Sequence, residues 1–477
     1  MRCPGFLRAV VLLSISLGIA RCSGRPVALT SRLSASQARA DLEQLRDLLY
    51  GGHPMTFTDR AGLTAEFDRQ RAALTDSLTV LDFYRVTSCI VAMVRCGHTE
   101  LSLPDEMRDD LYRSGHFLPL DVRVIRDTLF VYRSYASNTN VAAGCVIVSI
   151  NSVPAEAILN RLRGSVPADG AMPGKRDFLL NGRFSDYYLR FVEDTPSFEI
   201  EYAIPPGDPE THTAMIRADT WKNIRTAAKS DTCRWEEEAV VASVADDGTY
   251  AVLRIPFFDY GDERERFRRI VDSFFATLSE RRVGSLILDL RGNQGGDAYS
   301  AAYLLGYLLR ESFRYFSPSS TFLLGDLKEP QPIHEHRFAG NLYVLTDGGC
   351  CSTTGHLCAL LRYHGVGTFI GAETGGSYLC HGGFREHDLR HSRLHLLLPQ
   401  ATFIAAVEGL PRDRGIPPHH VVAPSLSDLL NCNHRVLDSA VHLARAAVGS
   451  GRAQGPQKRR DSDDRGTMEP AREGREP

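Results

Sequence analysis

Lysine is scarce in this chain of 477 residues, in which almost every basic side chain is an arginine. The only lysines are Lys175, Lys222, Lys229, Lys328 and Lys458. The stretch between Lys328 and Lys458 therefore holds no lysine, which excludes a lysine from within that stretch as a general base.

An excess of charge is also missing, because the formal net charge is -3 and the apolar fraction is an ordinary 43%. A near-neutral chain does not imply nucleic acid as a partner, and the composition is that of a globular protein. A length of 477 residues predicts two to four domains.

Long apolar runs are absent except near the start, where residues 9–20 are apolar and follow Arg2 and Arg8. This run is too short for a mature membrane span and predicts an export signal over residues 1–22. Cys22 stands where a lipid-modified cysteine would, although Arg21 is unusual there, so plain secretion and lipid attachment both stay open. We expect export to the periplasm or cell envelope.

Nine cysteines follow the signal, an odd number without the spacing of a metal site. This argues against a complete disulfide framework. Cys350 and Cys351 are adjacent in a predicted buried turn, and we interpret them as small apolar packing residues.

Four regions follow the signal. Residues 34–105 contain a helical pattern that starts at Ser34 or Ser36 and includes Leu42, Leu45 and Leu49, and further helical patterns at 62–73 and 80–95, which together predict a helical cap. Residues 115–205 are rich in predicted strands, residues 240–446 alternate strands and helices, and residues 449–477 have the composition of a disordered tail.

The second region alternates like a hairpin over residues 117–124 and 128–133. A strand over 145–150, a turn at Asn151-Ser152 and a helix through Leu162 follow. This order resembles the PDZ module, although Ser152 stands where glycine is usual. Peptide capture by strand addition is the function that such a module implies.

The third region predicts strands at 250–255, 285–290, 341–346 and 367–371, with helices at 262–282 and 353–364 between them. Strands that alternate with helices predict a mostly parallel sheet.

The most informative segment is residues 348–356, Gly-Gly-Cys-Cys-Ser-Thr-Thr-Gly-His, between a predicted buried strand and a helix. Ser352 thus occupies a glycine turn where a side chain is exposed at a sheet edge and helix N–H groups can stabilise an oxyanion. The alternative is that Ser352, Thr353 or Thr354 only caps the helix.

A second glycine-rich loop, residues 291–297, leaves another strand of the same predicted sheet. Ligands collect at the carboxyl ends of parallel strands. Neither loop has the spacing of a Walker or dinucleotide motif, which disfavours phosphate binding. Backbone N–H groups aimed at an oxyanion are the better use, and a structural turn is the alternative.

Three motifs in order resemble the C-terminal-processing and tricorn-core family of serine peptidases. They are residues 288–296, similar to its "DLRGNxGG" signature, residues 348–376, similar to its nucleophile region, and residues 414–419, similar to its "RGxxPD" segment with His419 in place of Asp. The resemblance covers most of residues 40–425. It implies an α/β fold with a ClpP/crotonase-like core, an N-terminal helical cap and an inserted PDZ-like module.

Members of the family differ in their general base. One branch places a lysine about 25 residues after the serine, where this chain has Ser377. The tricorn-like, interphotoreceptor-retinoid-binding-like branch takes a histidine from the cap, and Gly97-His98-Thr99 matches its segment. An imidazole can accept the seryl proton near neutral pH. We therefore expect His98 to be the base, with His53 and His356 as competitors.

The resemblance also implies an acid that orients the base, and it points to Asp413, with Glu408 and Glu373 as alternatives. A solvated surface carboxylate is the other interpretation of Asp413. For the oxyanion hole, the resemblance implies the N–H of Thr353 with that of Gly295 or Gly296.

The implied activity is that of a secreted serine endopeptidase that acts on peptide or unfolded protein without a metal or cofactor. An oligomer is compatible with it. The rival hypothesis is a non-catalytic protein that binds peptide or an apolar ligand on the same fold, and an esterase is a third.

Overall fold

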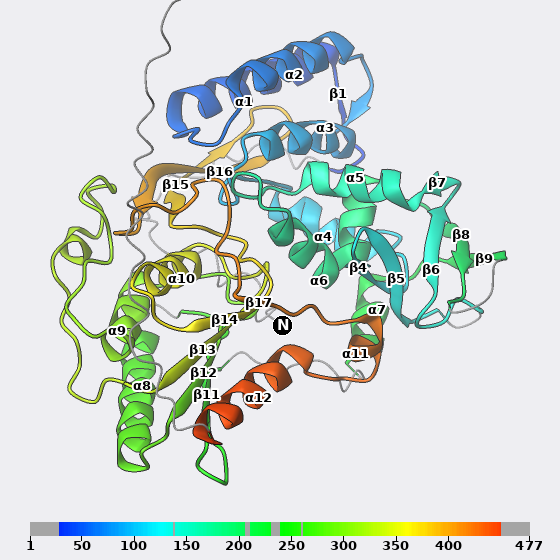
Figure 1. The fold of residues 1–477 in the computed structure, drawn as a ribbon. Coiled ribbons are helices and arrows are strands. Elements are labelled where there is room, and N and C mark those ends of the chain that lie inside the picture. The colour runs from blue at the N-terminus through cyan, green and yellow to red at the C-terminus, as the bar shows by residue number, and fades with distance from the viewer. Residues whose placement is uncertain (1–27, 137–138, 206–209, 230–238, 259–260, 450–477) are drawn as a thin grey trace, which may run out of the picture.

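A computed structural model describes residues 28–136, 139–205, 210–229, 239–258 and 261–449 (Figure 1). The predicted signal, with Cys22, and the predicted tail over 450–477 lie outside the described residues. Within these ranges, no helix combines the length and apolar character needed to cross a membrane. The described part has the mixed α/β architecture expected from the sequence.

The N-terminal cap consists of three helices, as predicted (Figure 1). Leu42, Leu45 and Leu49 recur on one face of the first helix and are buried. A short strand after the cap pairs with the core, so the loop between them, which holds His98, is fixed at both ends. The elements are α1 (Ala35–Gly52), α2 (Arg60–Ala73), α3 (Val80–Met93), β1 (Arg32–Leu33), β2 (Leu78–Thr79) and β3 (Glu100–Ser102).

The second region contains a sheet in the order β4-β5-β6-β8-β9, with β7 on β6. The predicted hairpin and the strand–turn–helix are confirmed, and the sheet continues to Arg217, beyond the predicted boundary at 205. Its likeness to a PDZ module stays a prediction. The elements are α4 (Asp105–Ser114), β4 (Leu120–Ile125), β5 (Thr128–Ser134), β6 (Val146–Ile150), β7 (Val153–Pro154), α5 (Ala155–Ser165), α6 (Pro173–Phe191), β8 (Ser197–Ala203), β9 (Thr211–Arg217) and α7 (Trp221–Ala228).

The core is a sheet in the order β10-β11-β12-β13-β14-β17, parallel except for the β10–β11 pair. The predicted strands and helices of this region are confirmed within a few residues. The elements are β10 (Val241–Val244), β11 (Ala251–Arg254), α8 (Asp262–Glu280), β12 (Ser285–Asp289), α9 (Ala298–Leu308), the 3-10 helix Gly325–Lys328, β13 (Asn341–Thr346), α10 (Thr353–Tyr363), β14 (Thr368–Gly371), β17 (His420–Val421), α11 (Leu426–Leu430) and α12 (Arg435–Gly449).

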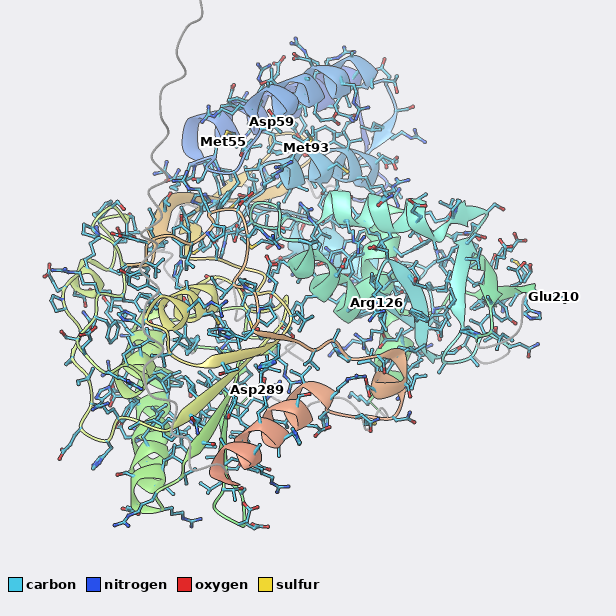
Figure 2. The ribbon with its side chains drawn as sticks, in the orientation of Figure 1. Met55, Asp59, Met93, Arg126, Glu210 and Asp289 are labelled. Carbon is cyan, nitrogen blue, oxygen red and sulfur yellow. The ribbon has the colours of Figure 1, made fainter. Side chains whose placement is uncertain are left out.

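Both faces of this sheet are covered, which explains why every residue of β12 is buried and its three central residues are apolar. Leu286 and Leu288 belong to the apolar cluster formed with α8, α9 and α10, whereas Ile287 packs with Val436 and Ala440 of α12 (Figure 1). A third sheet, of β15 (Leu379–Asp388), β16 (His395–Ile404) and β3, joins core and cap. Figure 2 marks the cap by Met55 and Met93 and the end of β12 by Asp289.

Candidate active site

The turn that holds Ser352 joins β13 to α10, as the sequence predicts. Ser352 has φ 54° and ψ -128°, a conformation that costs a residue with a side chain about 1–3 kcal/mol. Its side chain makes no capping hydrogen bond to the helix. The conformation is therefore not that of an ordinary N-cap, and it leaves the hydroxyl free for chemistry. That hydroxyl faces the buried thiol of Cys380 on β15.

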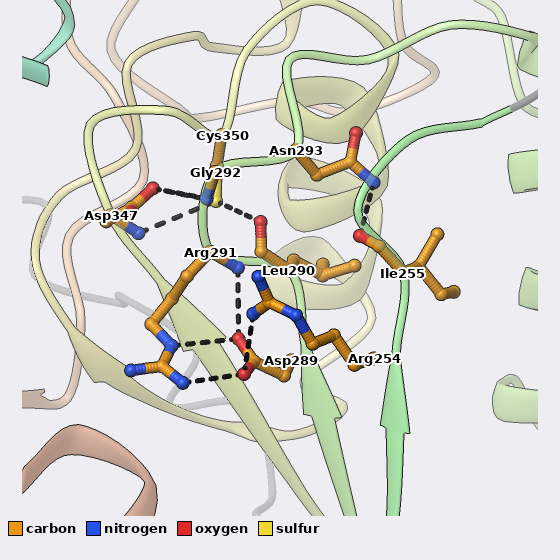
Figure 3. A network of polar contacts seen from close by, with 9 residues as sticks. All are labelled: Arg254, Ile255, Asp289, Leu290, Arg291, Gly292, Asn293, Asp347 and Cys350. Carbon is orange, nitrogen blue, oxygen red and sulfur yellow. Dashed lines mark hydrogen bonds and ion pairs between the residues drawn. The ribbon is translucent and has the colours of Figure 1, made fainter. Parts of the chain in front are cut away.

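The two glycine-rich loops are tied together by one carboxylate. Asp347 Oδ1 accepts the N–H of Gly292 at 2.9 Å (Figure 3) and also accepts the N–H of Gly349 at 2.8 Å. At the end of β12, Asp289 accepts from Arg254 at 3.0 Å and from Arg291 at 2.6 Å. This network fixes the position of the second loop beside the serine turn.

Gly295 lies directly against Ser352. A Cβ on Gly295 would come within 2.8 Å of Ser352 Cβ, and the φ of Gly295 is +107°. The N–H of Gly295 already donates to Asn293 Oδ1 at 2.9 Å. In contrast, the N–H groups of Gly296 and Thr353 donate to no acceptor in the described part of the chain. These two amides are the donors that the turn leaves available for an oxyanion.

His98 lies in the loop between α3 and β3, and its Nδ1 is buried with no hydrogen-bond partner in the described structure. Burial, and then the positive charge of Lys175, lower the pKa of His98 to about 4. Burial, and then the charge of the His98 imidazolium, lower the pKa of His356, which is one helical turn beyond Ser352 on α10. The half-buried cap histidine and the buried His356 of the serine helix thus lie close to each other.

The competing histidines have other environments. His53 Nδ1 accepts the N–H of Met55 at 2.8 Å, and its Nε2 lies 2.9 Å from Thr99 Oγ1. With Nδ1 as acceptor, Nε2 must carry the proton and donate, so both nitrogens of His53 are occupied in holding the loop. His356 is enclosed by Tyr315 and Phe316, and burial lowers its pKa to about 3.

Asp169, in the connection between α5 and α6, is the carboxylate that the structure places beside His98. It is 2% exposed, and one of its oxygens lies within 4.8 Å of a ring nitrogen of His98 and of the Cys96 sulfur. Asp169 Oδ1 also accepts the N–H of Gly97 at 2.7 Å. Burial raises the pKa of Asp169, and the Gly97 N–H opposes that shift.

Asp413, the acid that the family resemblance implies, has an exposed side chain. Its backbone carbonyl accepts the N–H of Ala171 at 3.0 Å, so this segment supports the loop that carries Asp169. Glu373 accepts from Arg414 at 2.8 Å and from the N–H of Gly415 at 3.0 Å, and Glu408 is exposed. The orienting role of Asp413 stays a prediction.

Lys175, at the start of α6, reaches the serine turn from the second region. Its Nζ donates to Gln294 Oε1 at 2.7 Å and to Cys351 Sγ at 3.1 Å, and the residue is 6% exposed. Cys351 is therefore more than a packing residue, whereas Cys350 donates to Leu290 O from a fully buried position, as expected of one. Lys175 precedes Ser352 in the chain, so the absence of lysine between Lys328 and Lys458 has no bearing on it.

The remaining departures from the family motifs have structural roles. Ser377, at the position of the family lysine, is buried, and its hydroxyl oxygen accepts a hydrogen bond from the N–H of Leu379 at 3.2 Å. His419 Nδ1 accepts the N–H of Phe369 at 2.8 Å and lies beside Arg362. Asp169 and Lys175 carry no motif, so the sequence offers no signal that could have identified them.

One protein-family model and several solved structures are similar to this chain. Residues 249–422 match the model of peptidase family S41. No curated protein matches the chain. Mature CPAF is similar in structure, with a TM-score of 0.61, 14% identity, and coverage of 88% of this chain and 99% of that one. CPAF in complex with lactacystin gives a TM-score of 0.61 and 13% identity over 87% of this chain and 98% of that one. At this identity, the likeness shows a shared fold.

Proposed function

The chain belongs to peptidase family S41, and we propose that it is a serine endopeptidase that cleaves peptide bonds through an acyl-enzyme. The observation that supports this most directly is the strained, uncapped Ser352 beside the amides of Gly296 and Thr353, which donate to no acceptor among the described residues. A helix cap needs neither the strain nor the free donors, whereas an acyl-transfer nucleophile uses both.

In the proposed reaction, Ser352 Oγ attacks the scissile carbonyl as His98 accepts its proton. The carbonyl oxygen becomes an oxyanion held by the Gly296 and Thr353 amides. His98 then returns the proton to the departing amine, which leaves an ester on Ser352, and water hydrolyses the ester in a second cycle of the same steps.

His98 needs help to act as a base, because burial and the Lys175 charge both disfavour the imidazolium. We assign that help to the Asp169 carboxylate, which lies beside the imidazole and can stabilise its positive charge. Asp413 is the competing assignment. Lys175 is a rival base, since its Nζ contacts Cys351, the residue before Ser352.

The test is hydrolysis of unfolded casein and peptide libraries by wild-type, Ser352→Ala and His98→Ala protein. Both variants should lose activity, while the exposed-residue controls Ser319→Ala and His336→Ala should keep it. Labelling by a fluorophosphonate probe should disappear in Ser352→Ala, fall in His98→Ala, and persist in the two control variants. Absence of labelling in folded wild-type protein would favour the non-catalytic binding protein instead.

The site of action is part of the proposal. The apolar run at residues 9–20 supports export to the periplasm or cell envelope, and Cys22 is the residue that would carry a lipid. Fractionation of cells that express wild-type and Cys22→Ser protein tests both points. Loss of membrane association in the variant supports the lipid, and retention of wild-type protein in the cytoplasm contradicts export.

A further inference from the structure

The proposed base, His98, lies together with two other side chains that can bind a metal ion, Cys96 and Asp169. The sulfur of Cys96, a ring nitrogen of His98 and a carboxylate oxygen of Asp169 all lie within 4.8 Å of one another. Thiolate, imidazole and carboxylate are the ligands that Zn²⁺ takes in proteins, at about 2.3, 2.0–2.1 and 2.0–2.2 Å. Ligands of one tetrahedral ion are about 3–4 Å apart at those bond lengths, so small side-chain movements would complete the set.

We propose that Cys96, His98 and Asp169 form a Zn²⁺ site that inhibits the enzyme by occupying its general base. A second observation independently favours a ligand here. The Nδ1 atom of His98 is buried and has no hydrogen-bond partner within the described structure, although buried polar atoms are normally satisfied.

The surroundings favour a metal ion that binds reversibly and inhibits over a metal ion that is permanently bound. Asp169 Oδ1 accepts the N–H of Gly97, which fixes the carboxylate in place as outer-shell contacts do. In contrast, the positive charge of the Lys175 ammonium lies close enough to lower the pKa of both His98 and Asp169, and it repels a cation bound between them. Binding converts the Cys96 thiol to a thiolate and releases its proton to solvent, with a water as the fourth ligand.

The first experiment measures binding without catalysis. Purified Ser352→Ala protein is titrated with Co²⁺, which reports a bound thiolate by a sulfur-to-metal charge-transfer band. The band should appear in proportion to protein and disappear when Zn²⁺ is added. Absence of the band would overturn the site, whether or not the chain proves to be a peptidase, because this assay does not depend on the proposed function.

The second experiment identifies the sulfur. In the Ser352→Ala background, Cys96→Ala should remove the band, whereas Cys145→Ala, which removes a buried thiol of the second region, should keep it. Equal thermal melting of the two variants shows that both are folded. A band that persists in folded Cys96→Ala protein would assign the metal to another site and overturn the proposal.

The inhibitory consequence rests on the proposed function. Zn²⁺ should inhibit hydrolysis by the wild type, a chelator should restore it, and inhibition of Cys96→Ala is measured relative to the metal-free rate of that variant. The Zn²⁺ concentration for half-inhibition should rise by about tenfold or more in that variant, the scale on which even outer-shell changes alter metal affinity. Equal inhibition of both proteins would show that this site does not control catalysis.

Discussion

The carboxylate of Asp169 accepts the N–H of Gly97 at 2.7 Å and so holds the peptide just before His98. Asp169 belongs to the second region and His98 to the loop after the cap. Gly170 N–H also donates to Arg95 O at 3.0 Å, so the two loops are joined on both sides of the carboxylate. The geometry of the proposed base therefore depends on a segment more than 60 residues away in the chain.

Asp169→Asn should lower kcat by about 10²–10⁴-fold with little change in KM. The amide oxygen can still accept the Gly97 N–H, so the loop keeps its shape, but the negative charge that stabilises the imidazolium is lost. Asp413→Asn is the matched comparison and should retain activity. Steady-state kinetics on both variants decide between the carboxylates, and the opposite pattern would restore the Asp413 assignment.

The pH dependence of activity should reflect the environment of His98, a half-buried residue whose Nδ1 atom is buried. The base acts only when neutral, and its pKa is lowered to about 4, so kcat/KM should stay high as pH falls through 6.5 and decline near pH 4. The measurement is the pH–rate profile with a small peptide substrate. A decline centred at 6.5 would show that a solvated histidine, and not His98, is the base.

Stability should fall in acid for a related reason. The pKa of His356 is lowered to about 3, whereas in the unfolded chain it is near 6.5. Between these values the unfolded state binds one more proton, so the free energy of unfolding decreases as pH falls below 6.5. The His356→Leu variant has no imidazole at this position to protonate. Its free energy of unfolding should therefore decrease by about 2 kcal/mol less than that of the wild type between pH 7 and pH 5.

Urea unfolding at the two pH values measures this difference. Burial raises the pKa of Asp169 and of Asp347, so these two groups make the free energy of unfolding increase as the pH falls. They contribute equally in both proteins, so their effect cancels in the comparison. An equal loss of stability in wild type and His356→Leu would show that His356 is protonated in the folded state.

The core was predictable from sequence because its signals are local. β13 follows the expected range 341–346, since an apolar run between Asn341 and a glycine turn can hardly form anything else. The position of Ser352 at a turn between a strand and a helix was predictable, because a strand–glycine–helix junction constrains its own backbone. The cap histidine needed the family resemblance, because nothing local distinguishes His98 from the fifteen other histidines.

Asp169 and Lys175 were not predictable, because tertiary packing alone brings them to the site. Gly174 approaches Gly348 so closely that a Cβ on Gly348 would lie 2.1 Å from Gly174 O. That contact delivers Lys175 to the serine turn from 176 residues away. The absence of lysine after Ser352 was a correct observation, but it limits only the bases supplied from that part of the chain.

Lys175→Met should separate the two candidate bases. If His98 is the base, removal of the nearby charge raises its pKa, so the acid limb of the pH–rate profile should move from about 4 towards 6.5 while activity persists. If Lys175 is the base, activity should fall as far as in Ser352→Ala. Lys229→Met, at an exposed position, is the control and should leave both rate and profile unchanged.

Gly295→Ala should damage the nucleophile without touching a charged group. The new Cβ would lie 2.8 Å from Ser352 Cβ and 3.0 Å from Thr353 N, at a φ of +107° that strains any side chain. Displacement of Ser352 and of the Thr353 amide should lower kcat by about 10²–10³-fold, the effect of losing one oxyanion donor. Gly51→Ala, where nothing lies within 4 Å of the added carbon, is the control and should be as active as the wild type.

Kinetics and melting curves are compared for the two variants. Full activity in folded Gly295→Ala protein would mean that Ser352 does not depend on this contact, and the proposed arrangement of the oxyanion site would be wrong.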